Sequence, residues 1–511
     1  MKNSKLANLK KKANNNIHGM SFKKKKGENI EKGIEEEAIS GNEQIEYEDE
    51  FEDEWEDEEV IDRNDSNEHE KEEEEWQEEE QDFSKPFLGT RQDIKEGEEL
   101  ACSPGAYRLL TQWTAEWPCL SFDFIVPAKN NEDISKVREF EHSSEFDSDI
   151  FMVAGSQANN PSNNSLYILK LSELEEEETN SENSFDQGGS EPDIYCQKIP
   201  LMSSTNRIRA MSNYPIVALL NEHAQLQLYD LRTSLATLQN QKGNSQKEKT
   251  STLALMQQFT LQDEGFALEF SKLVPGRLAC GIRNGSVLVY EPTNESFGGL
   301  TPLGQPIKTT NASIEDIKFS PNQTEVLATG ASDGVVRIYD LRAPINISNE
   351  LKINSHNCDI NVLAWNIKSP TLLATGADDG SFKVWDLRFI GKESISHVAW
   401  HKDQITSLEW QPHDQWTLLV GAGDDRVSIW DLSVEKDNNE IKDPTLEDIP
   451  DQLLFLHQGQ EGLKEVRWHP SSINTIGSTA LDGFNLFRPS LDEEEEETTS
   501  PNDLALIPEP I

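Results

Sequence analysis

The sequence predicts an all-β protein: a seven-bladed β-propeller with an N-terminal α-helix packed on its side and disordered acidic tails. Two observations predict the propeller. A hairpin motif recurs along the chain, and the shorter separations between its copies approach a common period, while the longer ones contain polar insertions. A third observation, the uneven distribution of charge, separates this repeating core from the tails. The 511 residues include 94 acidic and 46 basic side chains, which gives a net charge of −48.

The hairpin motif is clearest in the segments 327–342, 373–388 and 418–432. Each contains a strand of small residues, a tight turn with Asp, and an alternating strand that closes with an aromatic residue and Asp. Four weaker copies bring the closing positions to 169, 229, 290, 339, 385, 430 and 487. The shortest intervals approach the period of roughly 40–45 residues that is typical of WD repeats. These residues resemble the WD-repeat family, and the resemblance implies seven blades.

Histidines recur with the same period. His356 precedes Trp385 by 29 residues, and His401 precedes Trp430 by the same interval. Because they repeat with the blades, we interpret them as architecture rather than as catalytic bases. The resemblance to WD repeats implies a structural hydrogen-bond network inside the blades, formed by His356, Asp379, Trp385, His401, Asp425 and Trp430.

Other classes of function lack support in the sequence. No nucleophile elbow, phosphate-binding loop, zinc-protease motif or kinase motif occurs, so we predict no enzyme and no cofactor. The five cysteines lie at least 17 residues apart, which predicts neither a metal site nor a disulfide framework. The charge of −48 argues against direct binding of nucleic acid. No apolar run approaches the length of about 18 residues that a membrane span needs.

Charge and repeats together divide the chain. The predicted units are a basic tail (1–27), a disordered acidic tract (28–82), a lead-in with a helix (83–119), the propeller (120–491) with acidic insertions at 173–193 and 433–451, and an acidic tail (492–511). The acidic tract holds 29 acids and three bases, so like charges keep it open. Its isolated aromatic residues favour binding of a basic client, although plain solvation remains an alternative.

Two lysine clusters stand in the basic tail, separated by a spacer rich in Asn. They are Lys10, Lys11 and Lys12, and Lys23, Lys24, Lys25 and Lys26. Their two-part spacing resembles a bipartite nuclear-import signal, which implies importin as a partner and residence in the nucleus and nucleolus. The alternative is a solvated basic tail that no receptor recognises.

The segment before the propeller is predicted to be a helix that starts at Ser103 and Pro104 and stops before Pro118. Its ending, Glu116-Trp117-Pro118, resembles the N-terminal histone-binding helix of the retinoblastoma-binding and chromatin-assembly WD proteins. In that family an acidic loop before the last blade forms the second wall of a groove for a basic client helix. The resemblance places the groove at Leu110, Trp113, Trp117, Asp448, Ile449, Pro450 and Asp451.

The resemblance is closer still to the glutamate-rich WD-repeat branch of that family. It rests on the acidic N-terminal tract together with the segments 98–100, 457–459, 464–465 and 478–484. It implies a non-enzymatic ribosome-biogenesis factor, a chaperone that binds a basic large-subunit ribosomal protein (number three) and delivers it to pre-ribosomal particles. Two alternatives stay open. One is a histone-binding chaperone or chromatin adaptor. The other is a substrate receptor of a cullin-type ubiquitin ligase, because Trp385 to Arg388 resembles the WDxR box of such receptors.

Overall fold

The computed structural model describes a propeller core and one N-terminal strand. The described residues are 18–24, 88, 98–103, 105–126, 149–172, 174, 192–212, 214–241, 249–293, 299–342, 351–434 and 449–491. The predicted acidic tract, most of both acidic insertions and the C-terminal tail therefore lie outside the described residues. None of the helices in the described part has the length and apolar character needed to cross a bilayer.

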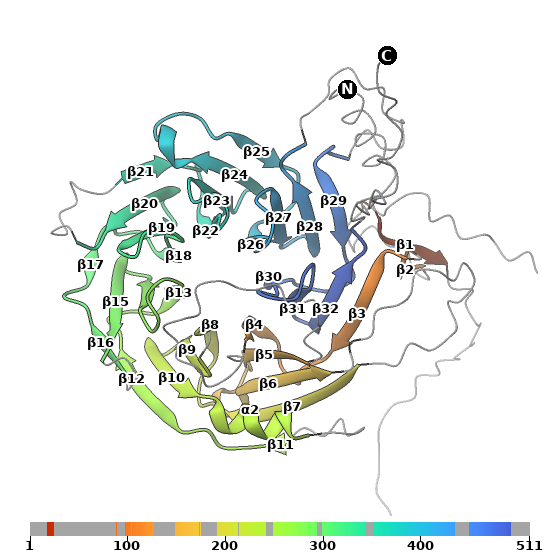
Figure 1. Ribbon diagram of the computed structural model, residues 1–511, viewed down its shortest axis with the longest axis horizontal. Coiled ribbons are helices and arrows are strands. Elements are labelled where there is room, and N and C mark those ends of the chain that lie inside the picture. The colour runs from red at the N-terminus through yellow and green to blue at the C-terminus, as the bar shows by residue number, and fades with distance from the viewer. Residues whose placement is uncertain are drawn as a thin grey trace, which may run out of the picture.

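Seven sheets form a ring around a central channel, which confirms the predicted seven-bladed propeller (Figure 1). From the channel outward, blade one consists of β4 (Cys119–Ile125), β5 (Asp149–Ser156), β6 (Ser165–Ser172) and β7 (Asp193–Pro200). Blade two consists of β8 (Thr205–Ala210), β9 (Ile216–Asn221), β10 (Gln225–Asp230) and β12 (Leu255–Thr260). Blade three consists of β13 (Gly265–Phe270), β14 (Leu278–Ile282) and β15 (Ser286–Pro292), and both β16 (Leu300–Pro302) and β17 (Ile307–Lys308) pair with β15.

The later blades repeat this order. Blade four consists of β18 (Ile314–Phe319), β19 (Val326–Ala331), β20 (Val335–Asp340) and β21 (Leu351–Asn354), and blade five of β22 (Ile360–Trp365), β23 (Leu372–Ala377), β24 (Ser381–Asp386) and β25 (Ser396–Ala399). Blade six consists of β26 (Ile405–Trp410), β27 (Thr417–Ala422), β28 (Arg426–Asp431) and β29 (Leu453–His457). Blade seven consists of β30 (Glu465–Trp468), β31 (Ile476–Ala480), β32 (Gly483–Pro489) and β3 (Tyr107–Trp113). Blade one also carries β11 (Lys249–Thr250) at its edge, and α2 (Arg232–Gln239) packs beside it.

The small residues of the repeated motif are explained by packing between blades. In β23 a Cβ atom at Gly376 would lie 2.6 Å from Cγ2 of Ile405, which belongs to the innermost strand of the next blade. The equivalent Gly330 of β19 faces Ile360 in the same way, at 2.8 Å. Real Cβ atoms do not approach other atoms this closely, so the second strand of these blades needs a residue without a side chain at this position.

The predicted N-terminal helix is wrong. Tyr107–Trp113 form β3, which pairs antiparallel with β32 and completes the seventh blade. Without β3, the backbone groups of β32 would form an open sheet edge, and pairing satisfies them. Tyr, Thr and Trp also favour strands, and helix propensity is weak enough for tertiary pairing to override it. The first strand of the repeating core thus closes the ring.

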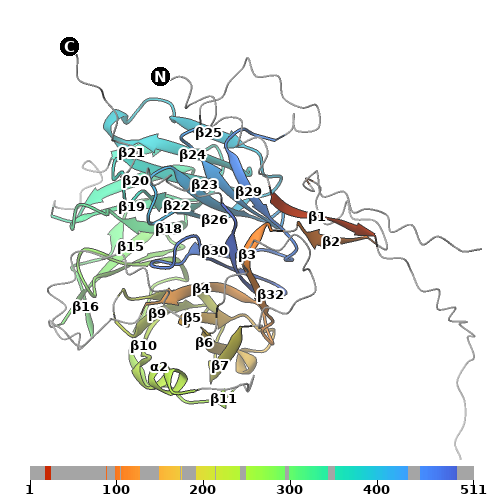
Figure 2. The ribbon, with the colours of Figure 1, turned by 45° about the vertical axis from the view of Figure 1, so that its right-hand side comes forward.

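The basic tail contains a strand that the sequence did not predict. The segment β1 (His18–Lys24) pairs parallel with β29 of blade six and antiparallel with β2 (Glu98–Cys102). The two strands extend from the side of the propeller (Figure 2). In this register Lys23 is opposite Glu99 and Lys24 is opposite Glu98. Part of one predicted import cluster therefore lies in a sheet.

Candidate functional site

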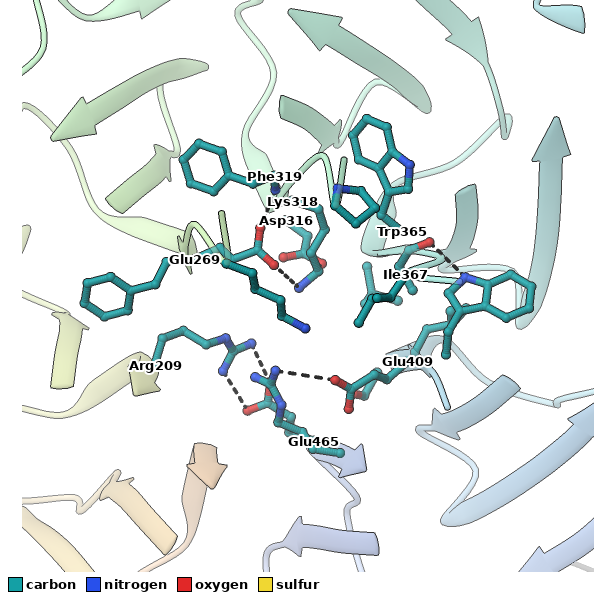
Figure 3. A pocket seen from close by; sticks show the side chains of 18 of the residues that line it. Arg209, Glu269, Asp316, Lys318, Phe319, Trp365, Ile367, Glu409 and Glu465 are labelled. Atoms are coloured by element: carbon teal, nitrogen blue, oxygen red, sulfur yellow. Dashed lines mark hydrogen bonds and ion pairs between the residues drawn. The ribbon is translucent and has the colours of Figure 1, made fainter. Parts of the chain in front are cut away.

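The central channel contains a cavity lined by the innermost strands (Figure 3). All connections from the innermost to the second strand lie on one side of the propeller, here called the AB face, because neighbouring strands of a blade alternate in direction. Lys272, Pro321 and Ile367 belong to these connections and line the cavity. The cavity therefore opens on the AB face. Its empty volume, counted together with the solvent-open space at the mouth, is about 800 Å³.

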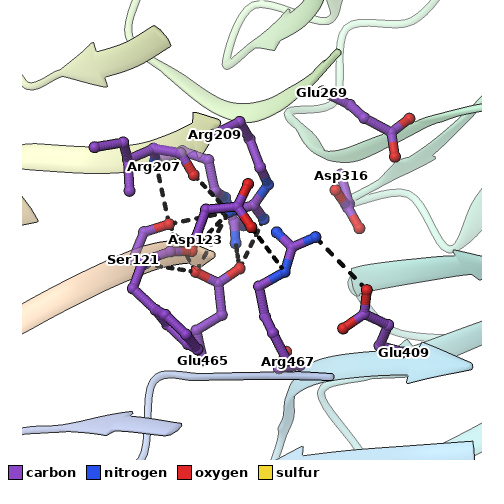
Figure 4. Close-up of polar contacts among 12 residues, drawn as sticks. Ser121, Asp123, Arg207, Arg209, Glu269, Asp316, Glu409, Glu465 and Arg467 are labelled. Atoms are coloured by element: carbon purple, nitrogen blue, oxygen red, sulfur yellow. Dashed lines mark hydrogen bonds and ion pairs between the residues drawn. The ribbon is translucent and has the colours of Figure 1, made fainter. Parts of the chain in front are cut away.

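A buried ion cluster lies inside the channel, with Glu465 of β30 at its centre (Figure 4). Its carboxylate accepts hydrogen bonds, at 2.7 to 3.3 Å, from Arg209 Nη2, Ser121 Oγ, the Phe122 amide and Arg207 Nη1. Burial by itself would raise the pKa of Glu465, but the positive charges of Arg209, Arg207 and Arg467 lower it well below the usual range. Glu465 is therefore ionised and links blade seven to blades one and two.

The acids of the channel share one structural role. Each lies on an innermost strand and accepts a hydrogen bond from a backbone amide of the next blade. The pairs are Asp123 with Ala210, Glu269 with Phe319, Asp316 with Leu363, Glu409 with Trp468, and Glu465 with Phe122. These links were not predicted from the sequence, although an acid occurs in each of these five innermost strands. Within the described ranges, no three His, Cys, Asp or Glu side chains are grouped as a metal site.

The predicted histidine network is present in blade five. His356 Nε2 lies 2.8 Å from Oγ1 of Thr375, which also accepts a hydrogen bond from Trp385 Nε1 at 3.1 Å. Asp379 reaches His356 through Ser381, whose hydroxyl donates to Asp379 at 2.6 Å and lies 3.5 Å from His356 Nδ1. Burial and the nearby Lys383 lower the pKa of His356 to about 4.

In blade six the predicted Asp425 is wrong, and Asp424 takes its place. His401 Nδ1 lies 3.2 Å from Asp424, while its Nε2 shares the Ser428 hydroxyl with Trp430. Burial by itself would raise the pKa of Asp424, but its contacts with His401 lower it. Asp425 instead has a φ of 64° and accepts hydrogen bonds from the amides at 462 and 463. This left-handed turn orients the Asp425 carboxylate toward the connection that leads into blade seven.

The residues of the predicted groove do not meet. Trp113 packs between Tyr167 and Phe484, with ring centroids 5.4 and 5.2 Å away, at the end of β3 opposite to the AB face. Trp117 follows at that same end. Ile449 lies four residues before β29, at the AB-face end of blade six, and is only 4% exposed. Two of the three predicted apolar contacts are thus separated from the loop, because β3 is a strand and not a helix.

The other predicted groove residues have mixed outcomes. Leu110 is half-buried and packs against the core cluster that contains Phe455. Pro450 and Asp451 are half-buried, and Asp448 lies outside the described residues. Among the predicted import lysines, Lys23 and Lys24 belong to β1, and the other five lie outside the described residues.

A closed ring of seven blades with histidine networks defines the class of this chain: it is a WD-repeat β-propeller protein. The model of the WD domain, G-beta repeat, matches residues 304–340, 348–386 and 392–431. A second family model, that of the histone-binding protein RBBP4 and the matching component of the CAF1 complex, covers residues 97–175.

Curated relatives cover most of the chain. Ribosome assembly protein rrb1 of Schizosaccharomyces pombe is 31% identical over 77% of this chain and 82% of its own length. Glutamate-rich WD repeat-containing protein 1 of Dictyostelium discoideum is 33% identical over 78% and 84%. Protein HEAT STRESS TOLERANT DWD 1 of Arabidopsis thaliana is 34% identical over 78% and 89%. The chain therefore belongs to the glutamate-rich WD-repeat family, as the sequence resemblance indicated.

Proposed function

We propose that this protein is a non-enzymatic ribosome-assembly factor, an acidic chaperone that binds a basic large-subunit ribosomal protein (number three) and delivers it to pre-ribosomal particles in the nucleus and nucleolus. The observation that carries the proposal is the relationship to ribosome assembly protein rrb1 over most of both chains. The net charge of −48 supports a basic protein as the client. The acids at the centre of the channel are engaged in links between blades, so the proposed client contact does not use them.

The acidic tract supplies the electrostatic part of the function. Residues 28–82 carry 29 acids against three bases, a charge of −26. A ribosomal protein carries basic surfaces intended for ribosomal RNA, and these bind stray polyanions while the protein is free. The tract offers carboxylates in place of phosphates. Such a diffuse interaction weakens with salt and yields to a denser polyanion, so ribosomal RNA displaces the chaperone without a nucleotide.

The AB-face end of blade six supplies the specific contact. There the insertion 433–451 returns to the propeller, and Ile449 anchors it in the core beside Leu453. Pro450 and Asp451 follow this anchor and are half-buried. In the proposed complex Asp448 and Asp451 pair with basic side chains of the client. Trp113 is no part of this contact because it packs on Tyr167.

The client contact is tested by exchanging Asp448 and Asp451 for Lys together. Two attractive charges become repulsive, and like charges at an interface cost several kcal/mol, so we expect at least about a tenfold loss of affinity for the ribosomal protein. A matched control exchanges Glu393 and Asp403, two exposed acids on other connections, for Lys. If a folded Asp448→Lys, Asp451→Lys protein binds as tightly as the control protein, this site is wrong.

A histone is the second candidate client, and one observation favours it. The segment 97–175 matches the histone-binding model, and it includes β3 and β4. Affinity purification at low salt, with identification of the dominant stoichiometric partner, separates the two clients. A histone as the only stoichiometric partner would replace the ribosomal protein in this proposal.

The ligase-receptor alternative rests on Arg388. Its side chain is 64% exposed, and its guanidinium holds Asp386 at 2.6 Å. Arg342 with Asp340 repeats this pair in blade four, which also suits ordinary blade chemistry. Binding of a ligase adaptor that is abolished by Arg388→Glu would support the receptor function. Equal adaptor binding by the unchanged protein and the Arg388→Glu variant, or no binding by either, would exclude the receptor function.

A further inference from the structure

The outer strand of blade three is broken into two short pieces, β16 and β17, which both pair with β15. The residues 301–305, which include the end of β16 and the loop after it, are all exposed. β16 lies on the outer rim of the ring (Figure 1). Short edge strands open more easily than the inner strands of a sheet, because few bonds hold them. This segment is therefore accessible to a modifying enzyme.

One residue of the segment has the sequence feature that proline-directed protein kinases require, a Ser or Thr directly before Pro. The chain contains five such pairs, which begin at Ser103, Thr301, Ser320, Ser369 and Ser500. Ser103 and Ser320 are buried, with 7% and 3% exposure, and the hydroxyl of the half-buried Ser369 donates to the neighbouring blade at 3.3 Å. Ser500 lies outside the described residues. Among the described pairs, Thr301 is the one that combines an exposed side chain with the extended backbone of a strand.

The outer edge of β16 is closed to a further strand. The Leu300 amide donates to the side-chain carbonyl of Gln257 at 2.7 Å, and the Gln257 amide group donates to the Leu300 carbonyl at 2.8 Å. Pro302, two residues further along the same edge, has no N–H to offer. An added strand would therefore find no free backbone donor on β16. The accessible reactive group of this strand is the Thr301 hydroxyl.

We propose that Thr301 is phosphorylated by a proline-directed protein kinase and that the phosphate keeps β16 off the edge of blade three. In this reaction Thr301 Oγ1 attacks the γ-phosphorus of ATP, a new O–P bond forms, the bond to ADP breaks, and the hydroxyl proton passes to the catalytic base of the kinase. Because Leu300 is only 1% exposed, the kinase acts on chains in which β16 has opened locally. The modification thus traps the opened state.

The charges around Thr301 explain why β16 does not return. Thr301 is directly opposite Glu291 of β15, and its hydroxyl lies 3.5 Å from the Glu291 carbonyl oxygen. A phosphate of charge about −1.5 to −2 on Thr301 faces the Glu291 carboxylate, and like charges in opposite positions destabilise a strand pair. Arg277 contacts Glu291 at 2.6 Å, but it also contacts Glu325 of blade four at 3.0 Å. Two acids already match this cation, so it does not neutralise the phosphate.

The test incubates the full chain with ATP and a purified cyclin-dependent kinase and locates the phosphate by mass spectrometry. We expect phosphate on Thr301, and Pro302→Ala should remove most of it. Gln257→Ala should raise the initial rate at Thr301 about tenfold, because two hydrogen bonds that hold β16 closed are lost. The control is Gln258→Ala in the same strand, which loses a hydrogen bond with Gln227 instead and should keep the rate.

Hydrogen exchange of the phosphorylated and unphosphorylated chain measures the effect on β16. We expect faster exchange of the amides at 300, 301 and 303 after phosphorylation and unchanged exchange in β19, while unfolding curves establish that every variant is folded. Phosphate that is absent from Thr301 or confined to the other four pairs would overturn the proposal. Equal rates for Gln257→Ala and Gln258→Ala, or unchanged exchange in phosphorylated β16, would also overturn it.

Discussion

The Tyr107 hydroxyl lies 2.8 Å from Nδ1 of His457, a residue 350 positions later in the chain. His457 Nε2 accepts a hydrogen bond from Asn485 at 3.1 Å, so Nδ1 carries the proton and donates it to Tyr107. The His457 ring also stacks on Phe487, with centroids 4.1 Å apart. This contact joins β3 of blade seven to β29 of blade six. The strand that closes the ring is thus held by a specific polar bond as well as by the sheet.

We expect Tyr107→Phe to destabilise the protein by about 1 to 3 kcal/mol, because Nδ1–H of the buried His457 loses its acceptor. Chemical denaturation followed by tryptophan fluorescence measures the loss. Tyr214→Phe is the matched control, since the Tyr214 hydroxyl has no hydrogen-bond partner among the described residues. Its effect should stay within about 0.5 kcal/mol. Equal stability of the two variants would mean that the Tyr107 bond does not hold the ring closed.

Glu465→Gln should be much more damaging. The variant keeps the shape of the side chain but leaves Arg209 and Arg207 in a buried site without their counter-charge. Breaking one partner of a buried pair costs about 3 to 5 kcal/mol. Asp263→Asn removes one of the two acidic partners of the exposed Arg283 and should cost no more than about 1 kcal/mol. Similar unfolding midpoints for both variants would contradict the central role of the channel cluster.

Stability should fall as the pH is lowered from 7 to 5. Burial lowers the pKa of His457 to about 3, and burial with Lys383 lowers that of His356 to about 4. The unfolded chain, with a histidine pKa near 6.5, binds protons in this range while the folded chain does not. Each histidine therefore lowers the free energy of unfolding by about 2 kcal/mol between pH 7 and pH 5. His457→Gln should flatten the pH dependence by that amount, and an unchanged dependence would show that His457 titrates alike in both states.

The repeat period predicted the ring because every blade makes mainly local hairpin pairs, and each hairpin has its own sequence signal. The pairing of β3 had no such signal, since β32 lies at the other end of the chain. Trp113 and Trp117 are four residues apart, which also suits a helix, and only the distant edge of β32 decides between the two structures. Asp424 and Asp425 differ by one position in one turn. The positive φ of Asp425, which the sequence does not reveal, selects Asp424 as the partner of His401.

Deleting residues 28–82 should leave the propeller folded and slow the capture of a basic client. None of the deleted residues belongs to a described strand, and their charge of −26 steers a cation from outside contact range. Raising the salt from about 0.1 M to 1 M shortens the Debye length from roughly 10 Å to 3 Å and should mimic the deletion. Stopped-flow association with the ribosomal protein measures the rates. Equal on-rates for intact and shortened protein at low salt would exclude steering.

Exchanging the lysines of both predicted import clusters for Ala should move a fluorescent fusion from the nucleus to the cytoplasm. Lys23 and Lys24 belong to β1, which lies between β29 and β2, whereas an import receptor must contact the cluster directly. The import receptor can therefore bind Lys23 and Lys24 only after β1 is released from blade six. We accordingly expect Lys10 to Lys12 alone to support partial import. Lys2→Ala with Lys5→Ala, outside both clusters, is the control. Unchanged nuclear accumulation of the cluster variant in cells depleted of the client, which excludes import as a passenger, would show that these lysines are a solvated tail and not a signal.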